Sequence, residues 1–394
     1  MLKLTIRRND APSYRTATIE FPAIEGDLQK QLNLIGVGVT TEKNCLVDKI
    51  SGDEDALQQL TGQCVNADEV QYLAKRMDSF DKKELQTFCA VAQSEQLTSV
   101  KDLINLTFNL HCYCLVSDFS DVDAIGKNFE FSRRMAMTMD EMKNTDFGEI
   151  GRKIISEKKG AITPYGVLYE TGNQPEQVYN GEQFPQYSYR GDEVAMVTLE
   201  VGDYHNSIKY EYLYLPCWDV EIEKALCRLG VDSLDSCATS LDCDVMDKSI
   251  YFIFTEDHPL SKHLHTLNNL TRAYLGFDEQ ACDAFHAIID MAMPKTPEDI
   301  ALLADNYYEF STVRGVGNPT EYGRHMILQS DRYEVDENLA EYIDFKRYGE
   351  QRVSREGGSF TDYGYIVYWG TTPAVEQLLR QDDTPSMTMG GLST

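Results

Sequence analysis

A chain of 394 residues with a formal net charge of −28 presents too little positive charge to bind nucleic acid or an anionic membrane directly. Its hydrophobic content of 42% is enough for folded cores, which excludes a chain that is disordered throughout. Acid is in excess in both halves: residues 1–193 hold 30 acidic and 21 basic side chains, a net of −9, and residues 194–394 hold 34 and 15, a net of −19. This excess favours a basic partner.

The first half predicts a small sheet, then helices, then a mixed C-terminal part. Strands are expected at Leu2–Ile6 and Arg15–Phe21, and a short helix at Glu25–Leu34 ends before Gly36. The later elements are a strand at Asn44–Ile50, helices at Asp68–Arg76, Asp81–Gln93 and Ser99–Leu106, a strand near Cys112–Val116, an acidic turn at Asp118–Asp123 and a closing strand at Gly166–Glu170.

Counterparts of these elements follow in the second half in the same order. A hairpin is expected at Ala195–Leu199 and Lys209–Leu215, with a helix at Val220–Leu229 that ends before Gly230. The later counterparts are a strand at Ser249–Phe254, helices at His263–Tyr274, Asp278–Met291 and Thr296–Ala304, and a strand at Tyr363–Trp369. Each half is therefore predicted to be α+β.

The two halves also match residue by residue, at an offset that drifts from 194 to 198. The matched pairs include Pro22 with Pro216, Phe88 with Phe285, Gly126 with Gly323, Gly151 with Gly349 and Gly160 with Gly358. A period of this length exceeds the roughly 20–50 residues of stacked solenoid repeats, so we predict a duplicated domain. The first repeat is expected at 1–193, with a sheet part at 1–62, a helical part at 63–108, a C-terminal part at 109–172 and a linker at 173–193. The second is expected at 194–394, with parts at 194–258, 259–304 and 305–372 and an acidic, flexible tail at 373–394.

The stretch from Tyr333 to Gly349 carries a regular acidic pattern. Asp336 is expected to cap a helix whose apolar side is formed by Leu339, Tyr342, Ile343 and Phe345. Glu337, Glu341 and Asp344 are spaced four and three residues apart, which on a helix places three carboxylates along one face.

This stretch resembles a known family. Tyr342–Gly349, preceded by Val335–Glu341, resembles the C-terminal signature of ArdA-type antirestriction proteins, as does Glu321–His325 before it. The opening hairpins, with Phe21-Pro22 or Leu215-Pro216 and a short helix ending in glycine, are similar to the N-terminal region of that family. The first repeat departs from the signature, because Met142–Gly151 lacks the Tyr-Ile-Asp core and Lys158-Lys159 replaces Glu356-Gly357.

The resemblance implies an elongated α+β protein of two tandem ArdA-like repeats, each with a small mixed sheet, a helical middle and a mixed C-terminal part. It implies inhibition of type I restriction–modification enzymes, which protects mobile DNA, by a DNA mimic that occupies the groove of the methyltransferase and specificity core. No enzyme activity, cofactor, direct nucleic-acid contact or membrane contact is expected. Each repeat resembles one protomer of the family's homodimers, so the chain is expected to be an internal pseudo-dimer, with a homodimer of two chains left open.

Charge density agrees with mimicry. Duplex DNA carries one charge per about 1.7 Å of axis, so 28 charges correspond to roughly 48 Å of duplex. The candidate mimic carboxylates form four clusters: Asp331, Glu334, Asp336, Glu337, Glu341 and Asp344; Asp232, Asp235, Asp242, Asp244 and Asp247; Asp118, Asp121 and Asp123; and Asp53, Glu54 and Asp55.

Two other functions stay open. A DNA mimic of this kind would also fit another target, such as a CRISPR nuclease or a nucleoid protein. A metal-dependent hydrolase would use His263 and His265 with nearby acids, although no acidic or cysteine ligand follows them at site-like spacing. Ten cysteines without a Cys-x-x-Cys motif, an N-terminus without a signal-peptide core and the absence of a long apolar run predict the cytoplasm.

Overall fold

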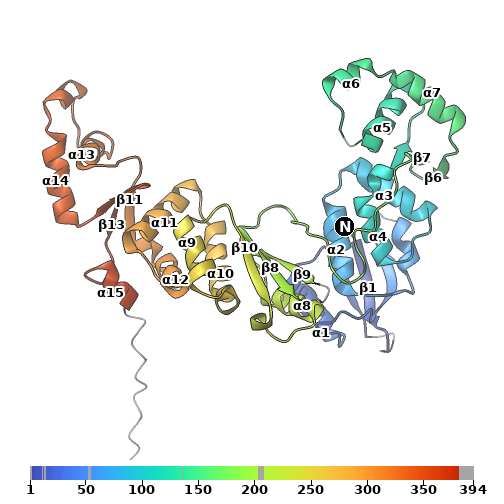
Figure 1. Ribbon diagram of the computed structural model, residues 1–394, viewed down its shortest axis with the longest axis horizontal. Coiled ribbons are helices and arrows are strands. Elements are labelled where there is room, and N and C mark those ends of the chain that lie inside the picture. The colour runs from blue at the N-terminus through green and yellow to red at the C-terminus, as the bar shows by residue number, and fades with distance from the viewer. Residues whose placement is uncertain are drawn as a thin grey trace, which may run out of the picture. The chain divides into compact units, whose positions relative to one another are not determined.

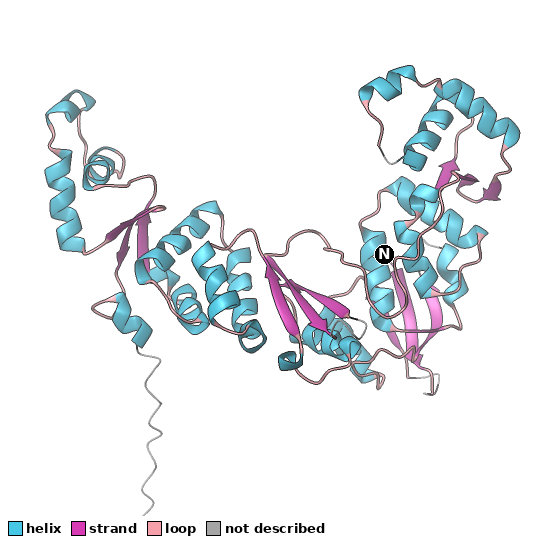
Figure 2. Ribbon diagram, viewed as in Figure 1, coloured by secondary structure: helices cyan, strands magenta, loops and turns pink. Residues whose placement is uncertain are grey.

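The computed structural model describes residues 2–10, 12, 15–51, 55–134, 136–202 and 208–380 (Figure 1). Two compact units are present. Unit 1 comprises Met1–Asp192, Glu200–Tyr212 and Trp218–Ser233, and unit 2 comprises Glu193–Leu199, Leu213–Cys217 and Leu234–Thr394. Unit 1 therefore includes two segments of the expected second half, so the compact units do not coincide with a division at residue 193. The chain is mixed α/β with four small sheets, each beside helices (Figure 2).

Unit 1 begins with a four-stranded sheet in the order β2-β1-β3-β4. Its strands are β1 (Leu2–Arg8), β2 (Ala17–Phe21), β3 (Cys45–Ser51) and β4 (Cys64–Val65). β1 is antiparallel to both neighbours, with Leu4 opposite Ile19 on one side and Ile50 on the other. Alternate residues of β1 are buried, as the two-residue period of a strand requires. The expected hairpin is confirmed.

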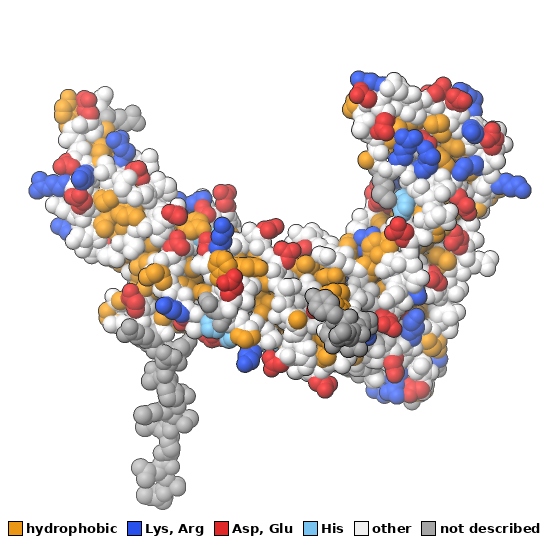
Figure 3. All heavy atoms as spheres, in the orientation of Figure 1, with side chains coloured by type: hydrophobic (Ala, Val, Ile, Leu, Met, Phe, Trp, Pro, Cys, Tyr) orange, Lys and Arg blue, Asp and Glu red, His pale blue; other side chains and the backbone are white. Residues whose placement is uncertain are grey.

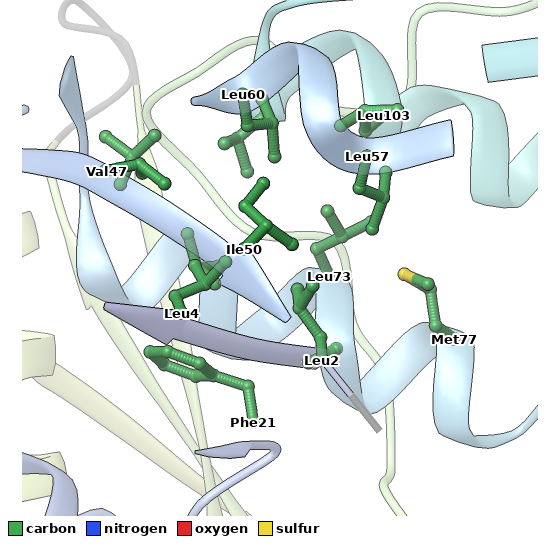
Figure 4. Packing of buried hydrophobic residues seen from close by; sticks show 14 of the residues in the cluster. Leu2, Leu4, Phe21, Val47, Ile50, Leu57, Leu60, Leu73, Met77 and Leu103 are labelled. Carbon is green, nitrogen blue, oxygen red and sulfur yellow. The ribbon is translucent and has the colours of Figure 1, made fainter. Parts of the chain in front are cut away.

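Helices cover this sheet and close the core of unit 1. They are α1 (Glu25–Leu34), η1 (Asp55–Leu60), α2 (Ala67–Asp78), α3 (Lys82–Ser94) and α4 (Val100–Phe108). Figure 4 shows Leu2 and Leu4 of β1 among Ile50 of β3, Leu73 of α2 and Leu57 of η1. The helices predicted at Asp68–Arg76, where an acidic N-cap was expected, Asp81–Gln93 and Ser99–Leu106 are confirmed, and Asn66 caps α2 in place of Asp68.

The next part of unit 1 is a three-stranded sheet, ordered β5-β7-β6, beside three helices. Its elements are η2 (Leu110–Cys112), β5 (Tyr113–Val116), α5 (Val122–Arg134), α6 (Met139–Asn144), α7 (Phe147–Glu157), β6 (Ala161–Thr163) and β7 (Gly166–Glu170). Helices α5 and α7 approach so closely that a methyl group on Gly126 or Gly151 would overlap backbone atoms of the other helix.

The linker was predicted at 173–193, and all of it but Glu193 packs into unit 1. The side chain of Tyr179 is buried, stacks on Phe184 with ring centroids 5.2 Å apart and donates a hydrogen bond to Glu69. The side-chain amide of Asn105 donates a hydrogen bond to the backbone carbonyl of Tyr179 and accepts one from its backbone N–H. This segment therefore contributes to the core of the unit that precedes it, which an exposed linker would not do.

A further sheet, ordered β10-β8-β9, is built from β8 (Ala195–Val201), β9 (Lys209–Leu215) and β10 (Ala238–Asp242). Helix α8 (Asp219–Leu229) follows β9, and η3 (Leu234–Ser236) precedes β10. Gly230 ends α8 in the left-handed conformation at φ 75°, which is the role expected of a C-terminal glycine. Both hairpins are followed by a cis X-Pro bond, at Phe21-Pro22 and at Leu215-Pro216.

The rest of unit 2 is a helical layer followed by a sheet ordered β11-β13-β12. Its elements are α9 (Lys248–Phe252), the π-helical turn η4 (Ile253–Asp257), α10 (Leu260–Leu275), α11 (Glu279–Ala292), α12 (Pro297–Asp305), η5 (Tyr307–Glu309), β11 (Phe310–Val313), α13 (Pro319–Leu328), η6 (Glu337–Tyr342), α14 (Phe345–Glu356), β12 (Ser359–Thr361), β13 (Gly364–Tyr368) and α15 (Val375–Arg380). The strand predicted at Ser249–Phe254 is wrong, because the Asp247 side chain caps the backbone of Ser249 and starts a helix there. α15 occupies the first part of the expected flexible tail, and 381–394 lie outside the described residues.

The two C-terminal sheets share local details as well as strand order. Thr163 Oγ1 donates to the carbonyl of Gly166 and accepts from the amide of Tyr165, and Thr361 makes the same pair of bonds to Gly364 and Tyr363. Helices α13 and α14 approach through two glycines, as α5 and α7 do. A methyl group on Gly323 or Gly349 would overlap backbone carbonyl oxygens of the facing helix.

Candidate functional site

The acidic stretch 331–344 does not form the single helix that its spacing predicted. Glu337–Tyr342 is a 3₁₀-helix, Ile343 is extended at φ −90° and ψ 126°, and α14 begins at Phe345. Because Ile343 interrupts the helical period, Glu341 and Asp344 do not share a helix face. The expected apolar side is also wrong in part, since Leu339 is 56% and Tyr342 79% exposed while Phe345 is buried.

Two carboxylates of this stretch act on the backbone. Asp336 accepts a hydrogen bond from the amide of Asn338 at 2.9 Å, and Asp344 accepts one from the amide of Arg347 at 3.0 Å. Each therefore caps the element that follows it, which satisfies amide groups that a helix start leaves free. Asp331, Glu334 and Glu341 are exposed. The side chain of Glu337 lies outside the described part of the structure.

The second cluster divides in the same way. Asp247 caps α9 and accepts the hydroxyl hydrogen of Tyr363 at 2.9 Å. Burial raises the pKa of Asp247, but hydrogen bonds from Ser249 and Tyr363 outweigh it and lower the pKa below its ordinary value. Asp235 accepts a hydrogen bond from Ser261 at 3.1 Å. Asp232, Asp242 and Asp244 are exposed.

The two clusters expected in the first half add little to a common surface. Asp118 and Asp121 are exposed and accept turn hydrogen bonds from the amides of Ser120 and Ala124, and the bonds from Ser120 lower the pKa of Asp118. Asp123 is exposed at the start of α5. Asp53 and Glu54 lie outside the described residues, as does the side chain of Asp55.

Among the predicted mimic carboxylates of the second half, six are thus exposed without a structural task, and we call them the exposed acidic set: Asp232, Asp242, Asp244, Asp331, Glu334 and Glu341. None of them forms an ion pair or a hydrogen bond with another residue of the described ranges. On the face drawn in Figure 3, acidic side chains are interspersed with basic and hydrophobic ones. Negative charge on that face is therefore scattered and not gathered into one uninterrupted patch.

A second group of charges, which the sequence did not predict, is buried in unit 1. We call Glu25, Asp68, Glu211, Lys224 and Arg228 the buried ion cluster. Lys224 Nζ of α8 lies 2.9 Å from Glu25 Oε2 of α1 and 2.7 Å from Asp68 Oδ1 of α2. Arg228, one turn further along α8, lies 3.3 Å from Asp68 and 2.8 Å from Glu211 of β9. The side chain of Lys224 is only 5% exposed.

The cluster keeps Glu25 and Lys224 charged despite burial. Burial raises the pKa of Glu25, but Lys75, at 2.9 Å, and Lys224 outweigh it and lower the pKa to about 2. Burial likewise lowers the pKa of Lys224, but Asp68 and Glu25 outweigh it and raise the pKa. The sequence contained one sign of this cluster: Lys224 and Arg228 lie four residues apart on a helix whose other side is apolar.

The C-terminal stretch that carries the exposed acidic set is also the stretch that can be compared with known proteins. Residues 219–367 match the family model described as Antirestriction protein (ArdA). The ArdA match begins at the first residue of α8 and ends within β13, so it covers only the C-terminal part of the chain. It associates this part with antirestriction proteins. Among curated proteins and solved structures, none matches the chain significantly.

The histidines of the hydrolase alternative lie on α10, within the ArdA-matched stretch. His263 Nδ1 is 2.9 Å from Glu298 Oε1. Among the residues that the structure describes, no group of three or more His, Cys, Asp and Glu side chains is placed to hold a metal ion. All ten cysteines are free thiols. Over the same described ranges, no helix combines the length and the apolar character needed to cross a membrane.

Proposed function

We propose that this protein is an antirestriction protein that inhibits type I restriction–modification enzymes by occupying the groove in which they bind DNA. The observation that carries the proposal is the ArdA match over residues 219–367, which contains every member of the exposed acidic set. A net charge of −28 supports it, because a DNA-binding groove is basic and attracts a partner of opposite potential.

We also propose that the chain is a tandem duplication of an ArdA-like unit, although the family match covers only its second part. The strand order β5-β7-β6 and the order β11-β13-β12 support this, as do the two helix pairs that approach through glycines. The glycines concerned are those that the sequence offset pairs, Gly126 with Gly323 and Gly151 with Gly349. Chance agreement of sequence spacing, strand order and helix contact in both units would require three separate coincidences.

The exposed acidic set is the part of the surface most suited to replace phosphates. A carboxylate that caps a helix is held against that helix by backbone amides, whereas an unpaired, solvated carboxylate can turn toward a lysine or arginine of the partner. Association driven by such charges is fast and weakens as salt screens them, with a Debye length of about 8 Å near physiological ionic strength. Binding should therefore fall steeply between low and moderate salt.

The test is a competition titration. A type I methyltransferase core is held on labelled duplex DNA and this protein is added at two salt concentrations. We expect displacement at near-stoichiometric amounts at low salt and weaker displacement at high salt. Displacement that is absent while the protein is demonstrably folded would refute the proposed target and direct the search to another DNA-binding protein, such as a CRISPR nuclease.

Isosteric variants test whether inhibition depends on these particular carboxylates or only on the total charge of the protein. The test variant removes three charges from the exposed acidic set: Asp242→Asn, Asp244→Asn and Glu341→Gln. The control removes three exposed charges elsewhere: Glu42→Gln, Asp140→Asn and Glu157→Gln. Both variants have the same net charge, so a larger loss of competition in the test variant would show that the exposed acidic set contacts the partner. Equal losses in the two variants would show that only total charge matters.

A further inference from the structure

We propose that the buried ion cluster is a directional joint through which the first half of the chain binds α8 of its own second half, and through which two copies of the chain do not pair. The joint itself stands on contacts within unit 1, where residues 218–233 belong with residues 1–192. Its direction rests on the proposed duplication, which says which residues of the two halves are equivalent.

The two sides of the joint carry opposite charges. Helix α8 supplies the cations Lys224 and Arg228, while α1 and α2 supply the anions Glu25 and Asp68. These groups are almost fully shielded from water: the side chain of Lys224 is 5% exposed, that of Glu25 11% and that of Asp68 15%. Removing one partner from such a site leaves a buried charge without compensation, which is strongly unfavourable. The surface therefore accepts only a partner that brings the missing charge.

The first half cannot take the place of α8. At the offset of 194 that relates the two hairpins, Lys224 is equivalent to Lys30 and Arg228 is equivalent to Leu34. Lys30 pairs with Asp27 of its own helix, and both side chains are exposed. Leu34 is 68% exposed and carries no charge. Two first halves brought together would bury Glu25 and Asp68 without the two cations.

The second half can supply only part of the acidic side, because Glu25 has an acidic equivalent, Asp219, at the offset of 194, and Asp68 has none. The offset lies between 194 and 197 in this region, and every value in that range pairs Asp68 with a residue that is not acidic: Lys262, His263, Leu264 or His265. Two second halves brought together would offer the two α8 cations the carboxylate of Asp219, but none in the place of Asp68. Neither like pair is therefore electrostatically satisfied.

Shape gives the same direction independently of charge. The indole ring of Trp218 packs over Gly26 of α1, where an added Cβ atom would lie only 3.0 Å from Trp218 Cε3. At the offset of 194, Gly26 is equivalent to Val220. A second half that took the acidic side would therefore present a branched side chain where the ring needs a glycine.

These asymmetries decide how the chain assembles. In a two-fold dimer each contact occurs twice, with equivalent residues exchanged, whereas a one-way contact between like units continues into rings or filaments. Here the contact is one-way, but the second half lacks the carboxylate equivalent to Asp68 that is needed to continue it. One chain thus satisfies the joint completely, and we expect it to be closed on itself through this surface.

The test uses the full chain with a specific protease site inserted between Gly191 and Asp192, in an exposed turn. After cleavage we expect the two halves to elute together with the mass of one chain. When a tagged and an untagged nicked protein are mixed, tagged first halves should capture second halves and not untagged first halves. Halves that separate freely, or first halves that pair with one another, would overturn the joint.

Two charge variants complete the test. Lys224→Glu should weaken the association of the nicked halves at least tenfold, and adding Asp68→Lys to it should restore part of that loss. Lys30→Glu, at the equivalent exposed position, should change nothing. A Lys224→Glu protein that associates as tightly as the parent would also refute the joint, provided that circular dichroism of the uncut variant shows it folded. No restriction enzyme enters these measurements, so their failure is distinguishable from failure of the proposed function.

Discussion

Gly349→Ala tests how closely the two helices of the ArdA-matched region approach. A Cβ atom at residue 349 would lie 1.7 Å from the carbonyl oxygen of Pro319 at the start of α13. Normal contact needs about 3.5 Å, so α13 and α14 would have to separate by about 1.8 Å. The obstacle is backbone, which cannot rotate away as a side chain can. Overpacking usually costs 1–3 kcal/mol, and we expect a value near the upper limit, about 3 kcal/mol.

The assay is thermal unfolding followed by calorimetry, in which two units are expected to give separable transitions. For a domain of this size, about 3 kcal/mol corresponds to a decrease of roughly 6–12 °C in the Tm of unit 2. Gly151→Ala should lower the Tm of unit 1 in the same way, because its Cβ would overlap the carbonyl oxygen of Val122. Gly38→Ala is the control, since nothing lies within 4 Å of its Cβ position. Equal Tm values for Gly349→Ala and Gly38→Ala would refute the close approach.

Three further predictions concern single residues. The pKa of Glu25 is lowered from 4.5 to about 2, so the stability that its ionised form contributes is present above pH 4.5 and is lost as pH falls toward 2. The unfolding free energy of Glu25→Gln, measured beside the parent across that range, should lack this part of the pH dependence. Burial lowers the pKa of His286 below 6.5, so the neutral imidazole contributes stability above pH 6.5 that is lost at lower pH. The substitution His286→Asn should therefore narrow the difference in Tm between pH 7.5 and pH 5.5. An unchanged difference would contradict this role of His286. Asn66 accepts bonds from the amides of Asp68 and Glu69 at the start of α2, so Asn66→Ala should destabilise unit 1 by about 1–2 kcal/mol in urea titration.

Local patterns predicted most of the regular elements. The helix expected at Glu25–Leu34 has those bounds in the structure, because its apolar residues recur at helical spacing and Gly36, at φ 82°, ends the turn that follows. The hairpin strands were found in the same way from alternating apolar residues. Apolar spacing and a terminal glycine act between residues that are close in sequence, so a single sequence is sufficient to recognise them.

The single helix predicted for the acidic stretch is wrong because the stretch contains two capping residues, Asp336 and Asp344, and each starts its own element. The spacing of Glu337, Glu341 and Asp344 predicted one helix, but Asp344 can serve either as a residue within that helix or as the cap of the next one. In the structure it caps α14, and the chain before it is left as a short 3₁₀-helix. The side chains of Leu339 and Tyr342 are exposed and do not pack into a core. Asp344, directly before the apolar Phe345, was a second start signal, and it outweighed periodicity.

The buried ion cluster could not be predicted from local sequence. Glu25 and Lys224 are 199 residues apart, and no local pattern indicates which carboxylate a lysine will meet at that distance. The sequence showed only that two cations share one side of α8. Which residues pair is decided by how the first half packs against that helix.

The packing of residues 173–192 and of α8 into unit 1 has a consequence for synthesis on the ribosome. Unit 1 includes residues up to Ser233, so its core cannot be completed when residue 172, the end of the predicted C-terminal part of the first repeat, has emerged. At translation rates of about 5–20 residues per second, the remaining 61 residues take roughly 3–12 seconds. At the end of that interval α8 emerges already tethered to the acidic side of its own chain, which raises its effective concentration there. Order of emergence thus favours pairing of each nascent chain with itself before a neighbouring chain on the same messenger can compete.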